Sequence, residues 1–209
     1  MTMRDAARLL LIEAAALPLV LDDAPEEALD GPTICTGWSV RDVLAHCGAA
    51  LTMTASGDRH GFTPEENETD VEQRRTWPLG DVLDELFDGY QAAAAAIDRA
   101  GGALDGIGLG EWVHGGDVRG ALGAPDAYSS AGSDLAVILL LARSAQLAKP
   151  SLETSIDGET GHFGVDEPPQ GTLVTDTATF VRLTGGRAPD PDRFTLNPEM
   201  SSFDLVLFS

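Results

Sequence analysis

The sequence has few basic residues and few cysteines. Thirteen lysines and arginines stand against 34 aspartates and glutamates, which gives a net charge of -21 at pH 7. Such a charge repels nucleic-acid phosphates and anionic membrane surfaces, so we discount both as partners. The two cysteines, Cys35 and Cys47, are too few for a disulfide framework.

Long apolar runs are also absent. The longest dense run, residues 135–142, is far shorter than the roughly 20 residues that span a bilayer. The N-terminal residues do not combine a basic segment, a long apolar core and a cleavage site. We therefore expect no transmembrane segment and a cytoplasmic protein. Its 209 residues, 43% of them hydrophobic, suffice for one large domain or two small ones.

Helical periodicity dominates the first two thirds of the chain. Apolar residues at a spacing near 3.6 predict helices over residues 3–21, 79–100 and 133–149, the last apolar nearly all round and therefore buried. A further helix is predicted to begin after Ser39, because Ser39 and Asp42 can form a capping box. Residues 56–77 are polar and lack periodicity, which predicts a long loop over the mouth of the bundle.

The pattern changes after Pro150. Residues 151–157, 172–175 and 203–208 are short and β-prone, and residues 176–183 have the pattern of a short helix. Residues 159–162 read as a glycine turn. The predicted architecture is a helical bundle over residues 1–130, followed by a small α/β module over residues 131–209.

The most informative stretch is the predicted helix over residues 111–123. Glu111, His114 and Asp117 are three residues apart and share one broad helix face. Glu-x-x-His on an inward face presents an oxygen and a nitrogen ligand to a divalent metal, although a solvated polar stripe has the same pattern. His46 lies at the edge of the buried stripe of its own helix, where a histidine is either a hydrogen-bonded core residue or a ligand.

Three segments together resemble the mycothiol-dependent maleylpyruvate isomerase family, a branch of the DinB-like metal-dependent four-helix bundles. The resemblance covers nearly the whole chain, and its motifs are GWSVRDVLAH at residues 37–46, EWVHGGDVRGALG at residues 111–123 and FVRLTGGR at residues 180–187.

The resemblance implies a divalent metal, commonly zinc, held by His46, Glu111 and His114. Two imidazoles and a carboxylate leave one corner of a tetrahedral site open, where a thiol becomes a nucleophilic thiolate. In the family this thiol is mycothiol, and it promotes cis–trans isomerisation of an enedione acid or is transferred to an electrophile. Family members usually carry the glutamate four residues before the histidine, where this chain has Gly110, and Asp117 could substitute.

Arg187 is the predicted catalytic cation, because a planar guanidinium suits the carboxylates of a diacid substrate. A surface ion pair is its alternative role. The predicted protein is a metal-dependent enzyme, monomeric or homodimeric, that uses mycothiol on a small electrophilic acid. The alternatives are a metal-free DinB-like protein that binds a small molecule and a repurposed biosynthetic enzyme.

Overall fold

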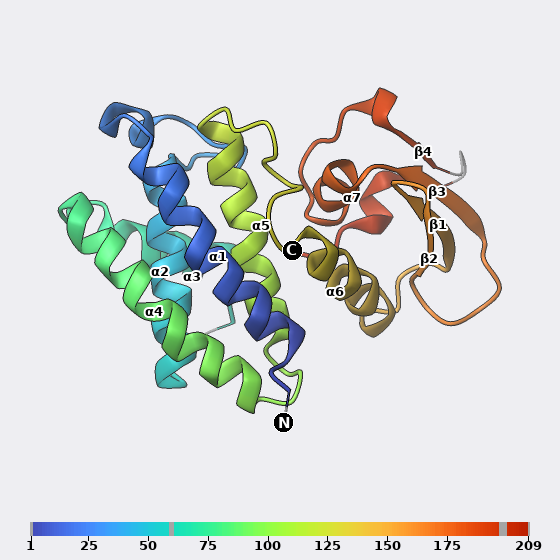
Figure 1. Ribbon diagram of the computed structural model, residues 1–209, viewed down its shortest axis with the longest axis horizontal. Coiled ribbons are helices and arrows are strands. Elements are labelled where there is room, and N and C mark those ends of the chain that lie inside the picture. The colour runs from blue at the N-terminus through green and yellow to red at the C-terminus, as the bar shows by residue number, and fades with distance from the viewer. Residues whose placement is uncertain (1, 59–60, 197–199, 209) are drawn as a thin grey trace. The chain divides into compact units, whose positions relative to one another are not determined.

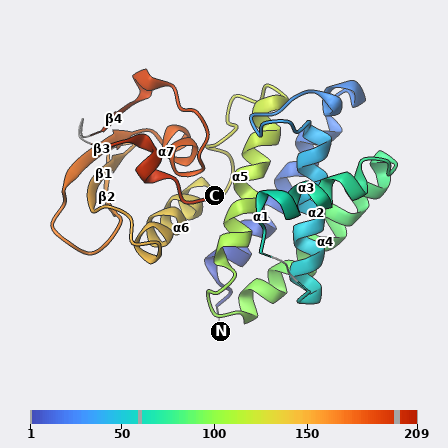
Figure 2. The ribbon, with the colours of Figure 1, turned by 180° about the vertical axis from the view of Figure 1, so that it is seen from behind.

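The computed structural model describes residues 2–58, 61–196 and 200–208. The chain divides into two compact units, residues 1–127 and 128–209 (Figures 1 and 2). The first is helical and the second combines helices with a small sheet, so the predicted fold class, a helical bundle followed by an α/β module, is confirmed. None of the described helices is both long and apolar enough to cross a membrane.

Four long helices build the first unit. They are α1 (Asp5–Asp22), α2 (Val40–Ser56), α4 (Leu79–Arg99) and α5 (Asp105–Ala121), with the 3-10 turn η1 (Glu26–Asp30) and the shorter α3 (Pro64–Arg74) between them. Helix α2 packs on α4 and α5, and α1 packs on α4 and α5, so the four surround one core. Leu9, Leu44, Leu86 and Trp112 are fully buried there.

A local sequence signal explains where α2 begins. The predicted capping box is present at α2: the Ser39 side chain accepts from the Asp42 amide, and the Asp42 carboxylate accepts from the Ser39 amide. Helix α1 continues through Pro18 to Asp22.

The prediction of a long loop over residues 56–77 is wrong. Within it, α3 begins after Thr63, whose side chain accepts from the Glu66 amide in a second capping box, with Pro64 in the first turn. The helix has no stripe of apolar residues, and Val71 is its one buried residue. Apolar periodicity therefore does not indicate a helix in this segment. His60 belongs to the same segment, where the sequence allows either a solvated histidine or one near the mouth of the site, and it lies outside the described residues.

The second unit packs two helices against a four-stranded sheet. Its elements are α6 (Ser133–Gln146), β1 (Leu152–Ile156), β2 (Glu159–Phe163), β3 (Gly171–Thr175), α7 (Thr177–Thr184), η2 (Pro191–Arg193), β4 (Phe194–Leu196) and η3 (Ser202–Leu205). The sheet order is β2-β1-β3-β4, with β1 and β3 parallel and the outer pairs antiparallel. The rings of Phe163 and Phe180 meet edge to face in its core.

Three predictions for this unit are wrong. Residues 159–162 belong to strand β2 rather than to a turn, because their backbone pairs with β1. Residues 203–208 include the 3-10 turn η3 instead of a strand. Helix α6 is not covered all round: Ile138 is 55% exposed, and only the face carrying Ala136, Leu140 and Ser144 is buried.

Candidate metal centre

Two polar side chains of α5 lie one turn apart on the same helix face. His114 Nδ1 is 3.0 Å from Asp117 Oδ2. The Asp117 side chain is fully buried, whereas that of His114 is 19% exposed. The pair therefore has a buried carboxylate behind an imidazole that solvent reaches from one side.

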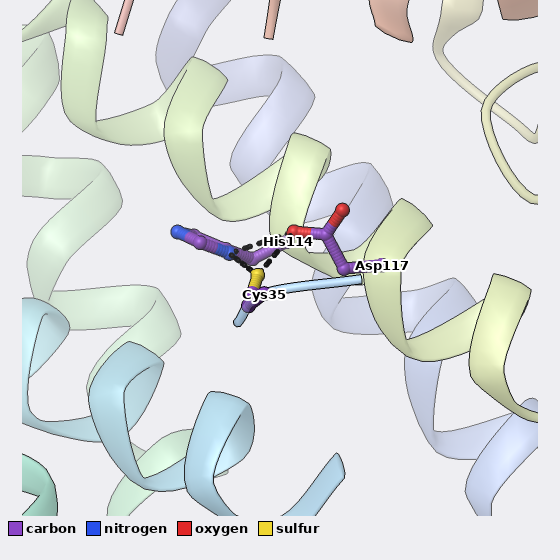
Figure 3. A group of neighbouring side chains, drawn as sticks. All are labelled: Cys35, His114 and Asp117. Carbon is purple, nitrogen blue, oxygen red and sulfur yellow. Dashed lines mark hydrogen bonds and ion pairs between the residues drawn. The ribbon is translucent and has the colours of Figure 1, made fainter. Parts of the chain in front are cut away.

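Cys35 joins this pair from the segment between η1 and α2 (Figure 3). Its thiol donates to Asp117 Oδ2 at 3.2 Å, and its Sγ lies 3.9 Å from His114 Nδ1. One ligand atom from each residue lies within 4.8 Å of the other two. Within the parts of the chain that the structure describes, this trio forms the one group of metal-ligating side chains with such spacing.

The backbone around Cys35 is fixed by its own hydrogen bonds. The Trp38 amide donates to the Cys35 carbonyl at 3.0 Å, and the Thr33 amide donates to the Trp38 carbonyl at 3.0 Å. Gly37 closes this turn at a φ of 85°, a left-handed conformation that other residues rarely adopt. The thiol is thus held in place by a built turn rather than by a free loop.

His46 reaches the same region from α2. Its buried ring lies 5.1 Å from the His114 ring, centroid to centroid, in an edge-to-face arrangement. The Trp38 ring also lies at a centroid distance of 5.1 Å from the His46 ring. The fold therefore brings together two of the three predicted ligands.

Glu111, on the same helix as His114, is buried. It forms a hydrogen bond with the Cys47 thiol of α2 and is not part of the Cys35 group. Its Oε2 atom is buried without a hydrogen-bond partner among the described residues. Burial raises the pKa of Glu111 to about 8, although the Cys47 hydrogen bond opposes the change.

A buried ion pair joins α5 to α1 behind the site. Arg119 donates to Glu13 at 2.9 Å, and the two side chains are 2% and 0% exposed. Desolvation raises the pKa of Glu13 to about 7 despite the attraction of Arg119. Gly115 makes room for the pair, because a Cβ atom there would lie 1.9 Å from Glu13 Oε1.

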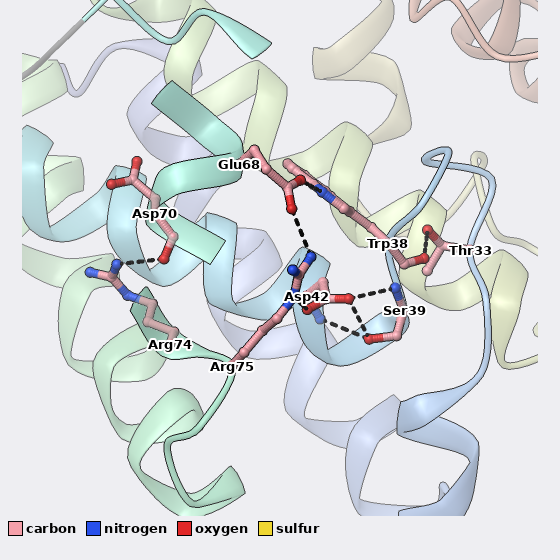
Figure 4. A network of polar contacts seen from close by, with 8 residues as sticks. All are labelled: Thr33, Trp38, Ser39, Asp42, Glu68, Asp70, Arg74 and Arg75. Atoms are coloured by element: carbon pink, nitrogen blue, oxygen red, sulfur yellow. Dashed lines mark hydrogen bonds and ion pairs between the residues drawn. The ribbon is translucent and has the colours of Figure 1, made fainter. Parts of the chain in front are cut away.

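Helix α3 and the turn after it are tied to the Trp38 side of the site (Figure 4). The Trp38 indole donates to Glu68 of α3 at 2.8 Å. Arg75 lies 2.7 Å from Glu68 and 3.5 Å from Asp42, the carboxylate that caps α2. A continuous set of contacts thus runs from α3 through Trp38 to the His46 ring.

Comparison with known proteins assigns the first unit to a family. Residues 10–122, more than half of the chain, match the family model described as the mycothiol maleylpyruvate isomerase N-terminal domain. The chain belongs to this family. The resemblance inferred from the sequence motifs is therefore confirmed.

Solved structures with this isomerase fold resemble the chain along nearly its whole length. A mycothiol-dependent maleylpyruvate isomerase is 12% identical, with a TM-score of 0.59, covering 96% of this chain and 95% of that one. A histidine-to-alanine mutant of a mycothiol-dependent maleylpyruvate isomerase gives a TM-score of 0.58 at the same identity and coverage. At this identity the likeness concerns the fold alone. No curated protein matches the chain.

The residues of this member of the isomerase family fit a divalent metal. Thiolate sulfur, imidazole nitrogen and carboxylate oxygen are the ligand types that zinc takes in proteins, and Cys35, His114 and Asp117 offer one of each. The sequence indicates Asp117 as a carboxylate that could substitute for the glutamate of the family. Cys35 was missed, because no local pattern connects a loop cysteine to a helix more than 70 residues away.

Arg187 belongs to the second unit. It follows α7 and the left-handed Gly186, and its guanidinium donates to the Gly185 carbonyl oxygen. Its catalytic role stays a prediction.

Proposed function

We propose that this chain is a metal-dependent enzyme that uses a low-molecular-weight thiol, mycothiol, on a small electrophilic acid. The reaction is cis–trans isomerisation of the acid or transfer of the thiol sulfur to it. Membership of the mycothiol maleylpyruvate isomerase family supports this proposal. The observation that carries it is the meeting of His46 from α2 with His114 from α5, beside the buried carboxylate of Asp117.

The chemistry rests on lowering the pKa of the thiol. A bound divalent ion stabilises the thiolate of a thiol whose ordinary pKa is about 8.5, so the nucleophile forms at neutral pH. His46 and His114 are the proposed imidazole ligands, and a carboxylate of α5 is the proposed third ligand. The sequence offers Glu111 for this place and Asp117 as its substitute, and Asp117 is the one that contacts His114. The His46 ring is buried and lies 5.1 Å from the Trp38 ring, centroid to centroid.

Metal content and thiol-dependent turnover test this function together. The protein is purified without chelators, analysed for transition metals, and assayed with maleylpyruvate in the presence and absence of mycothiol. We expect about one equivalent of metal and turnover that requires the thiol. Less than roughly 0.2 equivalents, with no binding on titration, would contradict the metal requirement, because a three-ligand site should retain its ion.

The contribution of His46 is tested by substitution. His46→Ala should lower both metal occupancy and turnover, because the loss of one imidazole leaves too few ligands. His162→Ala is the matched control, since His162 lies exposed on β2 and contacts the Val165 carbonyl oxygen. Equal metal content in the two variants would remove His46 from the ligand set.

A metal-free binding protein is the second candidate, favoured by Gly110 at the position where the family usually has a ligating glutamate. It predicts that mycothiol or a small acid binds in a calorimetric titration with neither metal nor turnover. Chelator-treated protein that binds mycothiol as tightly as untreated protein would favour this candidate.

Arg187 is proposed to bind a carboxylate of the substrate. Arg187→Ala should lower kcat/KM for a diacid substrate by roughly tenfold, about 1.4 kcal/mol, while metal content stays unchanged. Arg193→Ala is the control, because Arg193 forms an exposed ion pair with Asp176. An unchanged kcat/KM in Arg187→Ala would leave this arginine with a structural role.

A further inference from the structure

Cys35 is the residue near the two histidines that the proposed function leaves without a role. It is half-buried, and its turn is fixed by the hydrogen bonds between Thr33 and Trp38. The Cys35 amide also donates to the Thr33 hydroxyl at 3.1 Å. Its thiol is therefore aimed at α5 by the backbone.

The arrangement of Cys35, His114 and Asp117 is not that of a nucleophile and its base. In a cysteine–histidine–aspartate relay, the thiol contacts one ring nitrogen and the carboxylate contacts the other. Here both Cys35 Sγ and Asp117 Oδ2 approach the same atom, His114 Nδ1, at 3.9 and 3.0 Å. The three possible ligand atoms lie within 4.8 Å of one another, which is the spacing of ligands around one metal ion.

The donor spacing matches a small tetrahedral ion. Zinc bonds of about 2.0–2.3 Å at tetrahedral angles place nitrogen and oxygen donors about 3.3 Å apart, and sulfur about 3.6 Å from either. The corresponding separations here are 3.0 Å for His114 to Asp117, 3.2 Å for Cys35 to Asp117 and 3.9 Å for Cys35 to His114. Shifts of a few tenths of an ångström bring all three donors into the first coordination sphere.

The glutamate ligand expected from the family is missing four residues before His114. Gly110 has no side chain, and Glu111 is engaged with the Cys47 thiol. Asp117 lies one turn after His114 instead of one turn before it, and its carboxylate is fully buried at the cluster. The chain thus presents a carboxylate at the site from the helical turn that follows His114.

We propose that Cys35 is a thiolate ligand of the metal, and that Cys35 and Asp117, beside His114, take the place of the glutamate ligand of the family. This inference rests on the proposed function in that both require a bound divalent ion. A thiolate and a carboxylate together neutralise the charge of the ion. The sulfur ligand also favours zinc or cobalt over magnesium and manganese, which bind oxygen.

Cobalt spectroscopy of the full-length protein tests the sulfur ligand directly. Co²⁺ bound by a thiolate shows a sulfur-to-metal charge-transfer band in the near ultraviolet. We expect this band in the wild-type protein, its loss in Cys35→Ser and its retention in Cys47→Ser, because the Cys47 thiol is engaged with Glu111. Absence of the band from wild-type protein loaded with Co²⁺ would overturn the proposal, whether or not the variants fold.

Zinc affinity separates the three ligands from Glu111. Even the loss of a second-shell partner costs about 10–100-fold in affinity, so Cys35→Ser and Asp117→Asn should each raise the zinc Kd by about 100-fold or more. Glu111→Gln should change it by less than about 5-fold, and circular dichroism establishes that each variant is folded. A larger loss in Glu111→Gln than in Cys35→Ser would return the ligand role to Glu111.

The outcomes for the two proposals are distinguishable. Wild-type protein that binds metal through Cys35 but shows no thiol-dependent turnover retains the ligand assignment and overturns the proposed function. Thiol-dependent turnover with zinc affinity unchanged in Cys35→Ser overturns the ligand assignment alone. Protein that binds no divalent ion overturns both.

Discussion

Glu111 should make the metal-free protein less stable as the pH rises. Its carboxyl group is buried, one of its oxygens lacks a hydrogen-bond partner among the described residues, and desolvation raises its pKa from 4.5 to about 8. An acid with a raised pKa binds its proton more tightly in the folded state than in the unfolded state. Its contribution to stability is therefore complete below pH 4.5 and is lost as the pH rises through about 8.

The size of this effect follows from the pKa difference. A difference of about 3.5 pH units, at about 1.4 kcal/mol per unit, corresponds to an upper value of about 5 kcal/mol. About 3 kcal/mol of this should be lost between roughly pH 5.5 and pH 9. Glu13, whose pKa is raised to about 7, contributes in the same direction at lower pH.

Glu111→Gln isolates the contribution of Glu111, because glutamine keeps the size of the side chain but does not titrate. Urea unfolding in the presence of a chelator, repeated from about pH 5.5 to pH 9, gives the free energy of unfolding of both proteins. The variant should gain about 3 kcal/mol relative to wild type over this range. Parallel pH profiles for the two proteins would refute the reasoning, since other titrating groups cancel in the difference.

Three further predictions concern the bundle that carries the site. Gly115→Ala should destabilise the protein by about 1–3 kcal/mol in thermal unfolding, because the new methyl group overlaps Glu13. In the control Gly80→Ala, the new methyl group meets open space beside α4, so this variant should be neutral or stabilising by up to about 1 kcal/mol. Similar changes in stability for Gly115→Ala and Gly80→Ala would contradict the overlap with Glu13. Glu13→Ala should cost about 3–5 kcal/mol in urea unfolding, because a buried guanidinium loses its partner, and a cost below about 1 kcal/mol would show that the pair is solvated. Ser39→Ala should cost about 1 kcal/mol through loss of the α2 cap, with amide exchange fastest in the first turn, and uniform exchange along α2 would argue against this cause.

The parts of the fold that depend on local interactions were predictable from the sequence. The start of α2 follows from Ser39 and Asp42, which interact across three residues and depend on no distant segment. The pairing of His46 with His114 was also predictable, because each lies on the inward edge of a helix that periodicity identifies. Helix α3 carried an equally local signal at Thr63 and Glu66, but its polar surface concealed it.

The composition of the ligand set was not predictable in the same way. Cys35 meets Asp117 across 82 residues, and the contact depends on the turn at Gly37 and on the rotation of α5 about its axis. A helical face defined by three-residue spacing covers a wide arc, so Glu111 and Asp117 share it in sequence while their carboxylates have different neighbours. Only the packed structure separates a ligand from a buried acid on such a face.

Ion pairs of Arg74 and Arg75 hold α3 and the turn after it against the bundle, so added salt should weaken some of these contacts more than others. Arg74 and Glu85 form an ion pair at 2.5 Å with side chains only 11% and 14% exposed, where salt screens weakly. Arg75 is 43% exposed and 3.5 Å from Asp42, so solvent and salt ions weaken this ion pair more. Added salt should therefore weaken the ion pairs of Arg75 with Asp42 and Glu68 while the pair of Arg74 with Glu85 still holds α3 to α4. Small molecules should then exchange faster at His46 without unfolding of the bundle.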